Sequence, residues 1–548
     1  MAQMTGGEAL AKSLYREGVR VMFGLPGIQM YGIMSALRDE PGIRFITTRH
    51  EQATGYMADG YARAGGEGGF GTALVVPGPG LLNAAGALST AYSTSSPVLM
   101  VSGQVQRDYI GGDVGMLHEV NDQMEAIKPI TKFQRRALQV GDIPQAVHDA
   151  VLAMKTGRPR PVEIEIPPET LEEWGEAELL EASNPLRPAA PTKDIEKAVD
   201  MLSAAKRPVI FAGGGVVLGD AGEELRAVAE HLQAGVVMTA EGKGAIDSRH
   251  PLAVGSALSP NSPTVEYLQS ADVVLAVGSR LVRAGISPNQ TVIQLDIDPD
   301  EIGRNYSDAH GLAGDASATL SSLLEGLKAN GGQRDSAANE IGTVREAADA
   351  LAPGTQPQGD ILKSIRDNTP DDTLMVSGMT QVGYYSRSHW KTYGPRSFFT
   401  SGYSGNLGYA FPTGLGVKVA QPDKPVVITS GDGGFLYSSQ ELATAVQHNI
   451  NAIVVVFNDN AYGNVSRDLD NMWGGTYGAE LHNPDFVEMA EAYGVKGMKV
   501  DEPSEVGGAV ADAIQMDRPV LIEVPVGRMP QPAMFRGSDP DTTGSKSK

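Results

Sequence analysis

The sequence lacks cysteine, and it also lacks a long apolar run and a basic cluster. The absence of cysteine excludes disulfide bonds and thiolate metal sites, although it leaves the redox compartment open. No apolar stretch reaches the roughly 18 residues of a membrane-spanning helix. No basic, apolar, small-residue signal opens the chain either. We therefore expect a cytoplasmic protein with no membrane partner.

Basic residues are outnumbered: 44 Lys and Arg stand against 66 Asp and Glu, a formal net charge of −22. This balance argues against nucleic acid and anionic membranes as partners. It also predicts that an anionic ligand is held by a metal ion and by backbone groups. With 548 residues the chain is too long for one core, so two to four domains are expected.

One stretch, residues 430–463, carries the strongest pattern: SGDGGFLYSSQELATAVQHNINAIVVVFNDNAYG. The apolar run before it, PVVITS, predicts a strand that ends at the Gly-Asp-Gly-Gly turn. The following segment predicts an amphipathic helix with Leu442, Ala445 and Val446 on one face. NAIVVVF then predicts a strand buried on both faces of a parallel sheet, ending at an Asn-Asp-Asn turn.

Two carboxylates follow these two strands. In a parallel β-α-β unit both turns lie at the same sheet edge, so Asp432 and Asp459 are predicted neighbours. Paired carboxylates with nearby amide and carbonyl oxygens suit magnesium. Gly431, Gly433 and Gly434 leave backbone N–H groups to face an anion at a helix start. Taken alone, the Gly-Asp-Gly-Gly motif could be only a tight turn and the Asn-Asp-Asn motif only a polar loop. The two motifs together favour a bound diphosphate.

This arrangement resembles the signature of thiamine diphosphate enzymes, in which a Gly-Asp-Gly turn is followed by a helix, a strand and an Asn/Asp-rich turn. The second position of the last turn is often Asn in that family and is Asp459 here, which keeps an oxygen ligand. The resemblance covers nearly the whole chain and is closest to the acetolactate synthase, pyruvate oxidase and benzoylformate decarboxylase group. It implies thiamine diphosphate and Mg²⁺ as cofactors. The implied metal ligands are Asp432, Asp459 and the carbonyl of Ala461, with Tyr462 beside the cofactor.

Glu51 lies in RHEQATGYMADGYAR, where a strand runs into a helix. By itself it could be a first-turn acid that offsets the helix dipole. The context resembles the glutamate motif of the same family. There the glutamate hydrogen-bonds N1′ of the pyrimidine and promotes the imino tautomer, whose nitrogen removes the C2 proton of the thiazolium. The resemblance therefore implies that Glu51 is catalytic, and a raised pKa would suit this role.

Other positions of the first third are implied by the same resemblance. Gly27 ends a Gly-Leu-Pro-Gly turn, and Pro77 opens PGPGLLN, a turn that borders the site in the family. Asn83 either faces the substrate or caps a helix. His118 stands where acetolactate synthases often have Gln, and it is either catalytic, by holding or protonating a carboxylate or carbonyl group, or a surface-loop histidine.

The last third contributes the remaining cofactor contacts. Gly383 and Tyr384 follow the strand TLMVS and are implied neighbours of the diphosphate. Leu407 stands where the family keeps a large apolar residue that wedges between the two cofactor rings and enforces a bent conformer, a near-attack arrangement. The carbonyl of Gly405 is expected to hold the amino group of the pyrimidine. An ordinary core leucine is the alternative for Leu407.

A middle third has its own glycine turn, Gly213 to Gly215, after the strand PVIFA. It does not match Gly-x-Gly-x-x-Gly, so it indicates a dinucleotide site only weakly. In relatives that hold FAD this domain binds it. Arg280, in GSRLVRAG, could contact a nucleotide, but the rest departs from the run found in acetolactate synthases. The sequence favours a retained scaffold domain over an FAD site.

The fold predicted is α/β, with three doubly wound parallel-sheet domains at residues 1–184, 193–330 and 360–527. A tail follows at residues 528–548, and its last dozen residues are expected to be disordered. In the family, the glutamate of one subunit meets the diphosphate site of another. The resemblance therefore implies a homodimer or homotetramer with active sites between subunits.

The function implied is decarboxylation of a small 2-oxo acid, carboligation of the product to a second carbonyl compound such as an aldehyde, or both, as in acetolactate synthase. A benzoylformate decarboxylase-like enzyme or a 2-hydroxyacyl lyase is the enzymatic alternative, and His118 points to it. A catalytically decayed scaffold is the third reading. The intact set of Glu51, Asp432 and Asp459 argues against decay.

Overall fold

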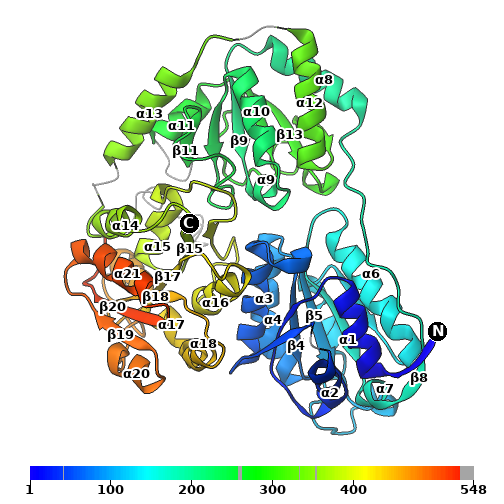
Figure 1. Ribbon diagram of the computed structural model, residues 1–548. Helices are drawn as coiled ribbons and strands as arrows, with labels where there is room; N and C mark the ends of the chain where they lie inside the picture. The colour runs from blue at the N-terminus through cyan, green and yellow to red at the C-terminus, as the bar shows by residue number, and fades with distance from the viewer. Residues whose placement is uncertain (41, 257–261, 332–333, 352–354, 531–548) are drawn as a thin grey trace.

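The computed structural model describes residues 1–40, 42–256, 262–331, 334–351 and 355–530. It contains three six-stranded parallel sheets with flanking helices, which confirms the predicted fold class (Figure 1). The sheet of the middle third stands apart, and the first and last thirds lie side by side below it (Figure 1). The end of the tail expected to be disordered lies outside the described residues.

The N-terminal sheet has the strand order β3-β2-β4-β5-β7-β6. A short antiparallel pair, β1 (Ala2–Thr5) with β8 (Trp174–Ala177), stands beside it. The sheet strands are β2 (Val21–Gly24), β3 (Arg44–Thr47), β4 (Gly71–Val75), β5 (Val98–Gly103), β6 (Phe133–Arg136) and β7 (Val162–Ile166). The helices are α1 (Gly6–Arg16), α2 (Tyr31–Asp39), α3 (Glu51–Arg63), α4 (Pro79–Thr94), α5 (Gln123–Ile127), α6 (Ile143–Lys155) and α7 (Pro168–Glu172).

The C-terminal sheet repeats this topology, with the order β16-β15-β17-β18-β20-β19. Its strands are β15 (Leu374–Ser377), β16 (Phe398–Phe399), β17 (Val426–Gly431), β18 (Ile453–Asn458), β19 (Lys496–Lys499) and β20 (Val520–Pro525). Its helices are α14 (Gln358–Asp367), α15 (Gln381–His389), α16 (Ala410–Ala420), α17 (Asp432–Leu436), α18 (Leu442–Gln447), α19 (Gly463–Trp473), α20 (Phe486–Ala492) and α21 (Val506–Gln515).

The middle sheet has a different order, β11-β10-β9-β12-β13-β14, which is that of dinucleotide-binding domains. Its strands are β9 (Pro208–Ala212), β10 (Gly235–Met238), β11 (Ala253–Ser256), β12 (Val273–Val277), β13 (Thr291–Asp296) and β14 (His310–Ala313). Its helices are α8 (Thr192–Ala204), α9 (Gly214–Leu218), α10 (Gly222–Leu232), α11 (Pro263–Gln269), α12 (Ala316–Asn330) and α13 (Ala338–Leu351).

The helix expected between β17 and β18 is split. The Gly-Asp-Gly-Gly turn itself opens the short α17, a 3₁₀ turn η8 (Ser439–Glu441) follows, and α18 begins only at Leu442. Leu442 and Ala445 are each 1% exposed, as predicted, but Val446 is 37% exposed. The prediction for Val446 is wrong because α18 is short. It ends at Gln447, and Val446 lies in its last turn, exposed to solvent.

The N- and C-terminal domains share one core, inside which α3 and α16 pack against each other. Glycines let the two helices touch: a β-carbon at Gly60 would lie 2.1 Å from the carbonyl oxygen of Thr413. Likewise, a β-carbon at Gly416 would lie 2.0 Å from the carbonyl oxygen of Met57. The backbone of α3, which begins at Glu51, is therefore fixed by direct contact with the C-terminal domain.

The other end of α3 joins all three domains. Arg63, only 6% exposed, donates from Nη1 to the carbonyl oxygen of Thr400 at 2.7 Å. Its Nη2 lies 3.1 Å from Oε2 of Glu241 in the middle domain, and its Nη1 pairs with the buried Asp59. A buried cation with this many partners fixes the relative placement of the domains.

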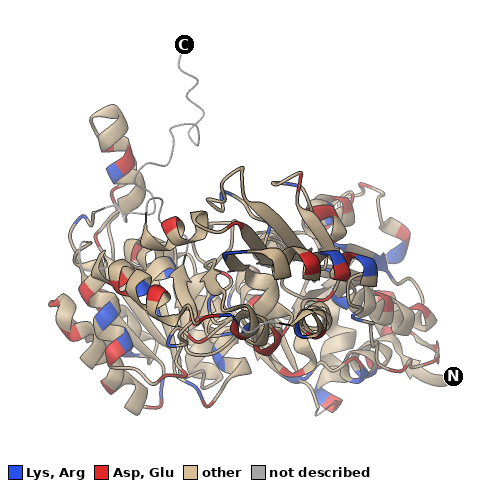
Figure 2. Ribbon diagram, turned by 90° about the horizontal axis from the view of Figure 1, so that it is seen from above, with Lys and Arg blue, Asp and Glu red and all other residues tan. Residues whose placement is uncertain are grey.

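Charged side chains are spread over the molecule. Figure 2 shows acidic and basic residues interspersed along the helices of the described chain. In the part of the chain that the structure describes, no helix is both long and apolar enough to cross a bilayer. The expected cytoplasmic location stays a prediction.

Candidate cofactor site at the sheet edges

The two aspartates predicted to bind a metal lie together at the carboxyl edge of the C-terminal sheet. Gly431 of β17 is in register with Phe457 of β18, so Asp432 and Asp459 emerge from neighbouring strands. Asp432 is 2% exposed, and burial raises its pKa. Burial and the nearby charge of Asp432 raise the pKa of Asp459 to about 6. A divalent cation between them would offset this repulsion.

A third polar side chain, which the sequence did not indicate, completes this edge. Asn483 donates from Nδ2 to Oδ2 of Asp432 at 2.6 Å and to Oδ1 of Asn458 at 2.9 Å. Its own Oδ1 is buried and has no hydrogen-bond partner. Such an orphaned oxygen fits a site that a cation or a ligand completes.

Backbone pairing brings Asn483 to this edge. Ala461 forms an isolated antiparallel bridge with Glu480, and the Tyr462 N–H donates to the Ala479 carbonyl at 2.8 Å. The backbone of Ala461 also lies against the Asp432 carboxylate and lowers its pKa. In the described residues, this edge included, no group of three or more acidic or histidine side chains could hold a metal, so a metal here would need oxygens other than carboxylates. A site of two carboxylates and a backbone carbonyl is therefore consistent with the structure.

The glycine turn is tightly packed at Gly433 and more open at Gly431. A β-carbon at Gly433 would lie 2.6 Å from the ring of Tyr462, so only glycine fits there without displacing that ring. A β-carbon at Gly431 would lie 3.6 Å from Cβ of Thr380. The expectation of free amides holds only in part, because the Gly433 N–H donates to Oδ1 of Asp432 at 2.8 Å.

Leu407 lies over the same turn. It is half-buried and not a core residue, and a β-carbon at Gly434 would lie 3.7 Å from its Cδ2. Gly405 has φ +62°, a left-handed conformation that favours glycine. Between them, Asn406 accepts a hydrogen bond from Oγ1 of Thr90 at 3.0 Å, which ties this loop to α4.

Gly383 and Tyr384 lie in the first turn of α15. The carbonyl of Gly383 accepts hydrogen bonds from Ser377 at 2.9 Å and Ser386 at 2.6 Å. Tyr384 is 8% exposed, and burial raises its pKa. The residue that faces Gly431 is Thr380, so the contact of Gly383 and Tyr384 with a diphosphate stays a prediction.

Glu51 is the first residue of α3, at the carboxyl edge of the N-terminal sheet. Its Oε2 accepts a hydrogen bond from Nδ2 of Asn83 at 3.1 Å. Asn83 is exposed and lies inside α4, so it caps no helix and instead orients this carboxylate. His50 caps α3, with Nδ1 accepting the Gln52 N–H at 3.1 Å.

His118 lies at the same edge, against the two turns that contain Gly27 and Pro77. Its Nδ1 is 3.1 Å from Oε1 of Gln29, and Nε2 of Gln29 donates to the Leu117 carbonyl at 3.1 Å. A β-carbon at Gly78 would lie 2.3 Å from the His118 carbonyl oxygen. His118 has φ +66° and is half-buried, so the loop holds it in place. The structure thus pairs Glu51 with Asn83, and it holds His118 against the turns of Gly27 and Pro77.

Gln123 fixes this group from behind. Its Oε1 accepts the Gly78 N–H at 3.1 Å, and its Nε2 donates to Oε2 of Glu165 at 2.6 Å. Glu165 and Glu163 are both fully buried, and burial together with the Glu165 charge raises the pKa of Glu163 well above its usual range. No sequence motif marks Gln123, because its partners come from distant strands.

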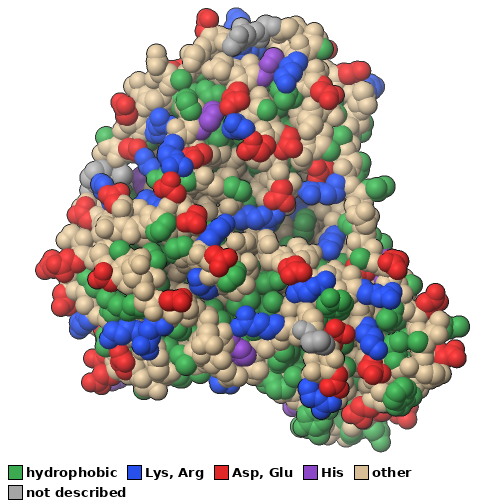
Figure 3. Space-filling view, viewed as in Figure 1, with side chains coloured by type: hydrophobic (Ala, Val, Ile, Leu, Met, Phe, Trp, Pro, Cys, Tyr) green, Lys and Arg blue, Asp and Glu red, His purple; other side chains and the backbone are tan. Residues whose placement is uncertain are grey.

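A cavity of about 990 Å³ lies where the three domains meet. Gly213, Gly278, Arg280 and Asp296 of the middle domain line it, together with Arg158 and Arg396 of the other two. Lys and Arg side chains gather below the middle domain on the face shown in Figure 3. The glycine amides themselves are committed, since Gly213 donates to the Val277 carbonyl at 2.9 Å and Gly215 to the Gly278 carbonyl at 3.0 Å.

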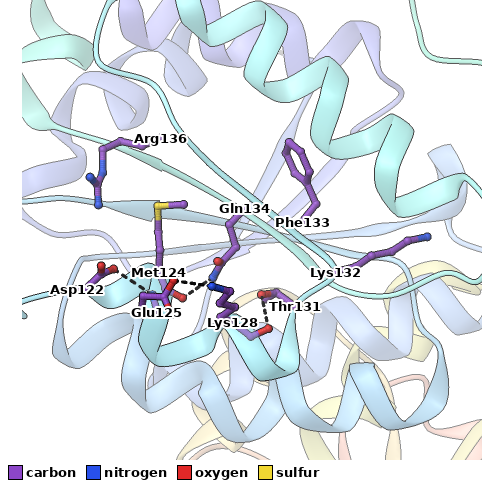
Figure 4. A pocket seen from close by; sticks show the side chains of 9 residues that line it. All are labelled: Asp122, Met124, Glu125, Lys128, Thr131, Lys132, Phe133, Gln134 and Arg136. Carbon is purple, nitrogen blue, oxygen red and sulfur yellow. Dashed lines mark hydrogen bonds and ion pairs between the residues drawn. The ribbon is translucent and has the colours of Figure 1, made fainter.

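A second hollow of about 450 Å³ lies beside α5 and β6. Figure 4 shows that Lys128, Lys132 and Arg136 point in different directions and do not converge. Lys128 pairs with Glu125, and Arg136 with the buried Glu165. This hollow therefore has no arrangement that would bind a particular ligand.

Comparison with known proteins assigns all three parts of the chain to one family. Residues 4–126 match the thiamine pyrophosphate enzyme N-terminal TPP binding domain, residues 195–323 its central domain, and residues 378–524 its C-terminal TPP binding domain.

Full-length relatives agree with these domain matches. A probable acetolactate synthase large subunit of Methanocaldococcus jannaschii is 34% identical, over 95% of this chain and 92% of its own. A probable 2-ketoarginine decarboxylase of Pseudomonas aeruginosa is 36% identical, over 90% and 88%. The large subunit of acetolactate synthase isozyme 3 of Escherichia coli is 31% identical, over 96% and 95%.

Proposed function

We propose a function for this chain from the premise that it belongs to the thiamine pyrophosphate (thiamine diphosphate) enzymes. It decarboxylates a small 2-oxo acid and joins the product to a second carbonyl compound, as an acetolactate synthase does. The observation that carries the proposal is the pair Asp432 and Asp459 at one sheet edge, with Asn483 Oδ1 left without a partner. That donor set fits Mg²⁺ and a diphosphate. When bound, thiamine diphosphate supplies an electron sink for the bond that breaks.

Metal binding would fall to Asp432, Asp459 and the carbonyl of Ala461, with Asn483 orienting the first carboxylate. The turn of Gly431, Gly433 and Gly434 would face the diphosphate, and Tyr462 would flank it. Leu407, half-buried over this turn, would support the cofactor rings, and the Gly405 carbonyl would hold the pyrimidine amino group.

Glu51 would hold and move the proton at the pyrimidine end of the cofactor. Asn83 fixes its Oε2, which leaves Oε1 for a ring nitrogen. Gly27 and Pro77 would shape the wall on the same side. His118, held by Gln29, would bind or protonate the substrate carboxylate or carbonyl.

The complete site would form between two chains. Large apolar side chains are exposed around the Glu51 edge: Ile28 52%, Tyr31 58%, Val114 57% and Leu117 61%. Others are exposed in the segment that follows Asp459: Val465 52%, Trp473 77% and Tyr477 94%. Exposed apolar patches of this kind mark protein interfaces. We therefore propose a homodimer, or a homotetramer built from it, in which Glu51 of one chain faces Asp432 of the other.

A simple decarboxylase is the second candidate, because a relative named 2-ketoarginine decarboxylase is 36% identical. In that case the product would be released as an aldehyde. FAD is the alternative to the scaffold role of the middle domain: the arginine-lined cavity favours it, whereas the committed amides of Gly213 and Gly215 argue against it.

Calorimetric titration with thiamine diphosphate and Mg²⁺, followed by a panel of 2-oxo acids and aldehydes, tests the proposal. The panel includes pyruvate and 2-ketoarginine, with carbon dioxide and the organic product both identified. Carboligation from pyruvate supports the first candidate, and an aldehyde product supports the second. Absence of cofactor binding would contradict both. A purified protein with the yellow absorbance of a flavin would establish FAD.

A further inference from the structure

The backbone segment before Glu51 belongs to a sheet edge that another domain covers. β3 is the outermost strand of the N-terminal sheet, so one row of its N–H groups points away from the sheet. The Thr48 N–H turns inward and donates to the Gly24 carbonyl at 3.1 Å. The N–H groups of Thr47 and Arg49 turn outward, toward the C-terminal domain of the same chain.

Two side chains of that domain take up the outward N–H groups. His448 Nε2 accepts the Thr47 N–H at 3.0 Å. Both carboxylate oxygens of Glu441 lie 3.1 Å from the Arg49 nitrogen and share its N–H. These two side chains therefore accept the hydrogen bonds that the backbone carbonyls of a further strand would accept at an unpaired sheet edge.

Glu441 is the better-built of the two acceptors. It is 0% exposed, and Oγ1 of Thr444 donates to its Oε2 at 2.6 Å. Burial raises the pKa of Glu441 to about 7, although the hydrogen bonds from Thr444, Arg49 and His50 lower it. Burying a carboxyl group costs free energy unless the group is hydrogen-bonded. A backbone hydrogen-bond partner of Glu441 is the N–H of Arg49, two residues before Glu51.

We propose that Glu441 is a positioning residue for the catalytic Glu51. It fixes the backbone at Arg49 from the C-terminal domain and so sets where α3 begins and where the Glu51 carboxylate projects. Asn83 then fixes the carboxylate itself, and α16 fixes the body of the helix. This inference rests on the proposed function, because it assigns Glu51 its role toward thiamine diphosphate.

The proposal separates two properties of the enzyme. The diphosphate end of the cofactor would be held by Asp432 and Asp459, to which Glu441 makes no hydrogen bond, so cofactor affinity should change little. Removal of the proton at C2 of the bound cofactor would depend on the placement of Glu51. A displacement of about 1 Å at such a group lowers rates by up to about a hundredfold.

The test uses the full-length protein with Glu441→Gln, which keeps the shape but replaces one of the two oxygens that share the Arg49 N–H with an NH₂ group. Hydrogen–deuterium exchange at C2 of bound thiamine diphosphate is expected to slow about tenfold or more. The dissociation constant of the cofactor should change less than about threefold. Amide exchange in the peptide spanning residues 44–52 of the cofactor-free protein should become faster.

Glu491→Gln is the matched control. It also alters a glutamate that accepts a backbone N–H, that of Gly497 at 3.1 Å, but it is exposed and remote from α3. His448→Ala provides a second variant should Glu441→Gln fold poorly, and the same direction of change is expected from it.

Two outcomes separate the claims. If the unaltered protein binds no thiamine diphosphate, the proposed function is wrong. The second outcome is that the unaltered protein binds the cofactor and Glu51→Gln slows C2 exchange, but folded Glu441→Gln matches the unaltered protein in both C2 exchange and amide exchange. In that case the positioning role is overturned and the proposed function stands.

Discussion

Asn483 shows how a single amide can organise a charged site. It donates to one carboxylate oxygen of Asp432 and to Oδ1 of Asn458, so one amide group serves two acceptors at this sheet edge. Outer partners of metal ligands orient them and raise their affinity. If these carboxylates hold Mg²⁺ as proposed, Asn483 would contribute to metal binding without touching the metal.

Replacing Asn483 with Ala is expected to weaken Mg²⁺ binding in the presence of thiamine diphosphate about 10- to 100-fold, because Asp432 loses the donor that orients it. Titration calorimetry measures the change. His482→Ala, at the exposed neighbouring position, is the control and should leave the affinity unchanged. Equal affinities of the two variants would show that the Asn483 contact is incidental.

Asp432, Asp459 and Asn483 illustrate what the sequence could and could not predict. Asp432 and Asp459 were predictable as neighbours because both follow apolar strands of one β-α-β unit, and parallel strands present their carboxyl ends at one edge. Asn483 lies in a loop without periodicity, and it reaches the edge only because the backbone near Ala461 pairs with Glu480. Such irregular pairing leaves no pattern in the sequence.

Helix α3 links several of these residues. Its start carries Glu51, its middle packs on α16 through Gly60 and Gly416, and its last residue, Arg63, reaches the other two domains. The sequence predicted the helix and the junction at Glu51. It could not predict the contact with α16, because the glycines that permit it are far apart in the chain and look like any helical glycine.

Gly416→Ala is expected to lower the free energy of unfolding by about 1–3 kcal/mol, because the added methyl group would lie 2.0 Å from the Met57 carbonyl oxygen and force α3 away from α16. Chemical denaturation measures this change. Gly508→Ala is the control: it is also a helical glycine, but no atom lies within 4 Å of its added β-carbon. It should raise stability by about 0.4–1 kcal/mol. Equal effects would rule out the close contact.

The same strand order in the first and last sheets, and a different one in the middle sheet, was not evident from the sequence. Alternating strands and helices predict a parallel sheet but not which strands are neighbours, which depends on crossovers over many residues. The molecule is assembled from these units through buried polar contacts. Lys243 of the middle domain, 5% exposed, donates to the Trp390 carbonyl of the C-terminal domain at 2.8 Å.

Burial, and to a lesser degree the charge of Lys391, lowers the pKa of Lys243 to about 7. Between pH 7 and about 10.4 the unfolded chain binds a proton at this group that the folded chain does not, so stability rises with pH there. Lys243→Met should remove that rise, which is at most about 1.4 kcal/mol per pH unit. Melting temperatures of both proteins at pH 7, 8 and 9 measure it. Parallel curves would mean that Lys243 keeps its usual pKa.

The most direct test of the account asks whether Glu51 and Asp432 act from different chains. Glu51→Gln and Asp432→Asn are each expected to abolish C2 exchange of thiamine diphosphate. If the two inactive variants are dissociated and reassembled in equal amounts, half of the dimers are mixed and each has one intact site. About a quarter of the original exchange should then return. A mixture no more active than its two parents would place both residues in one chain and contradict the account.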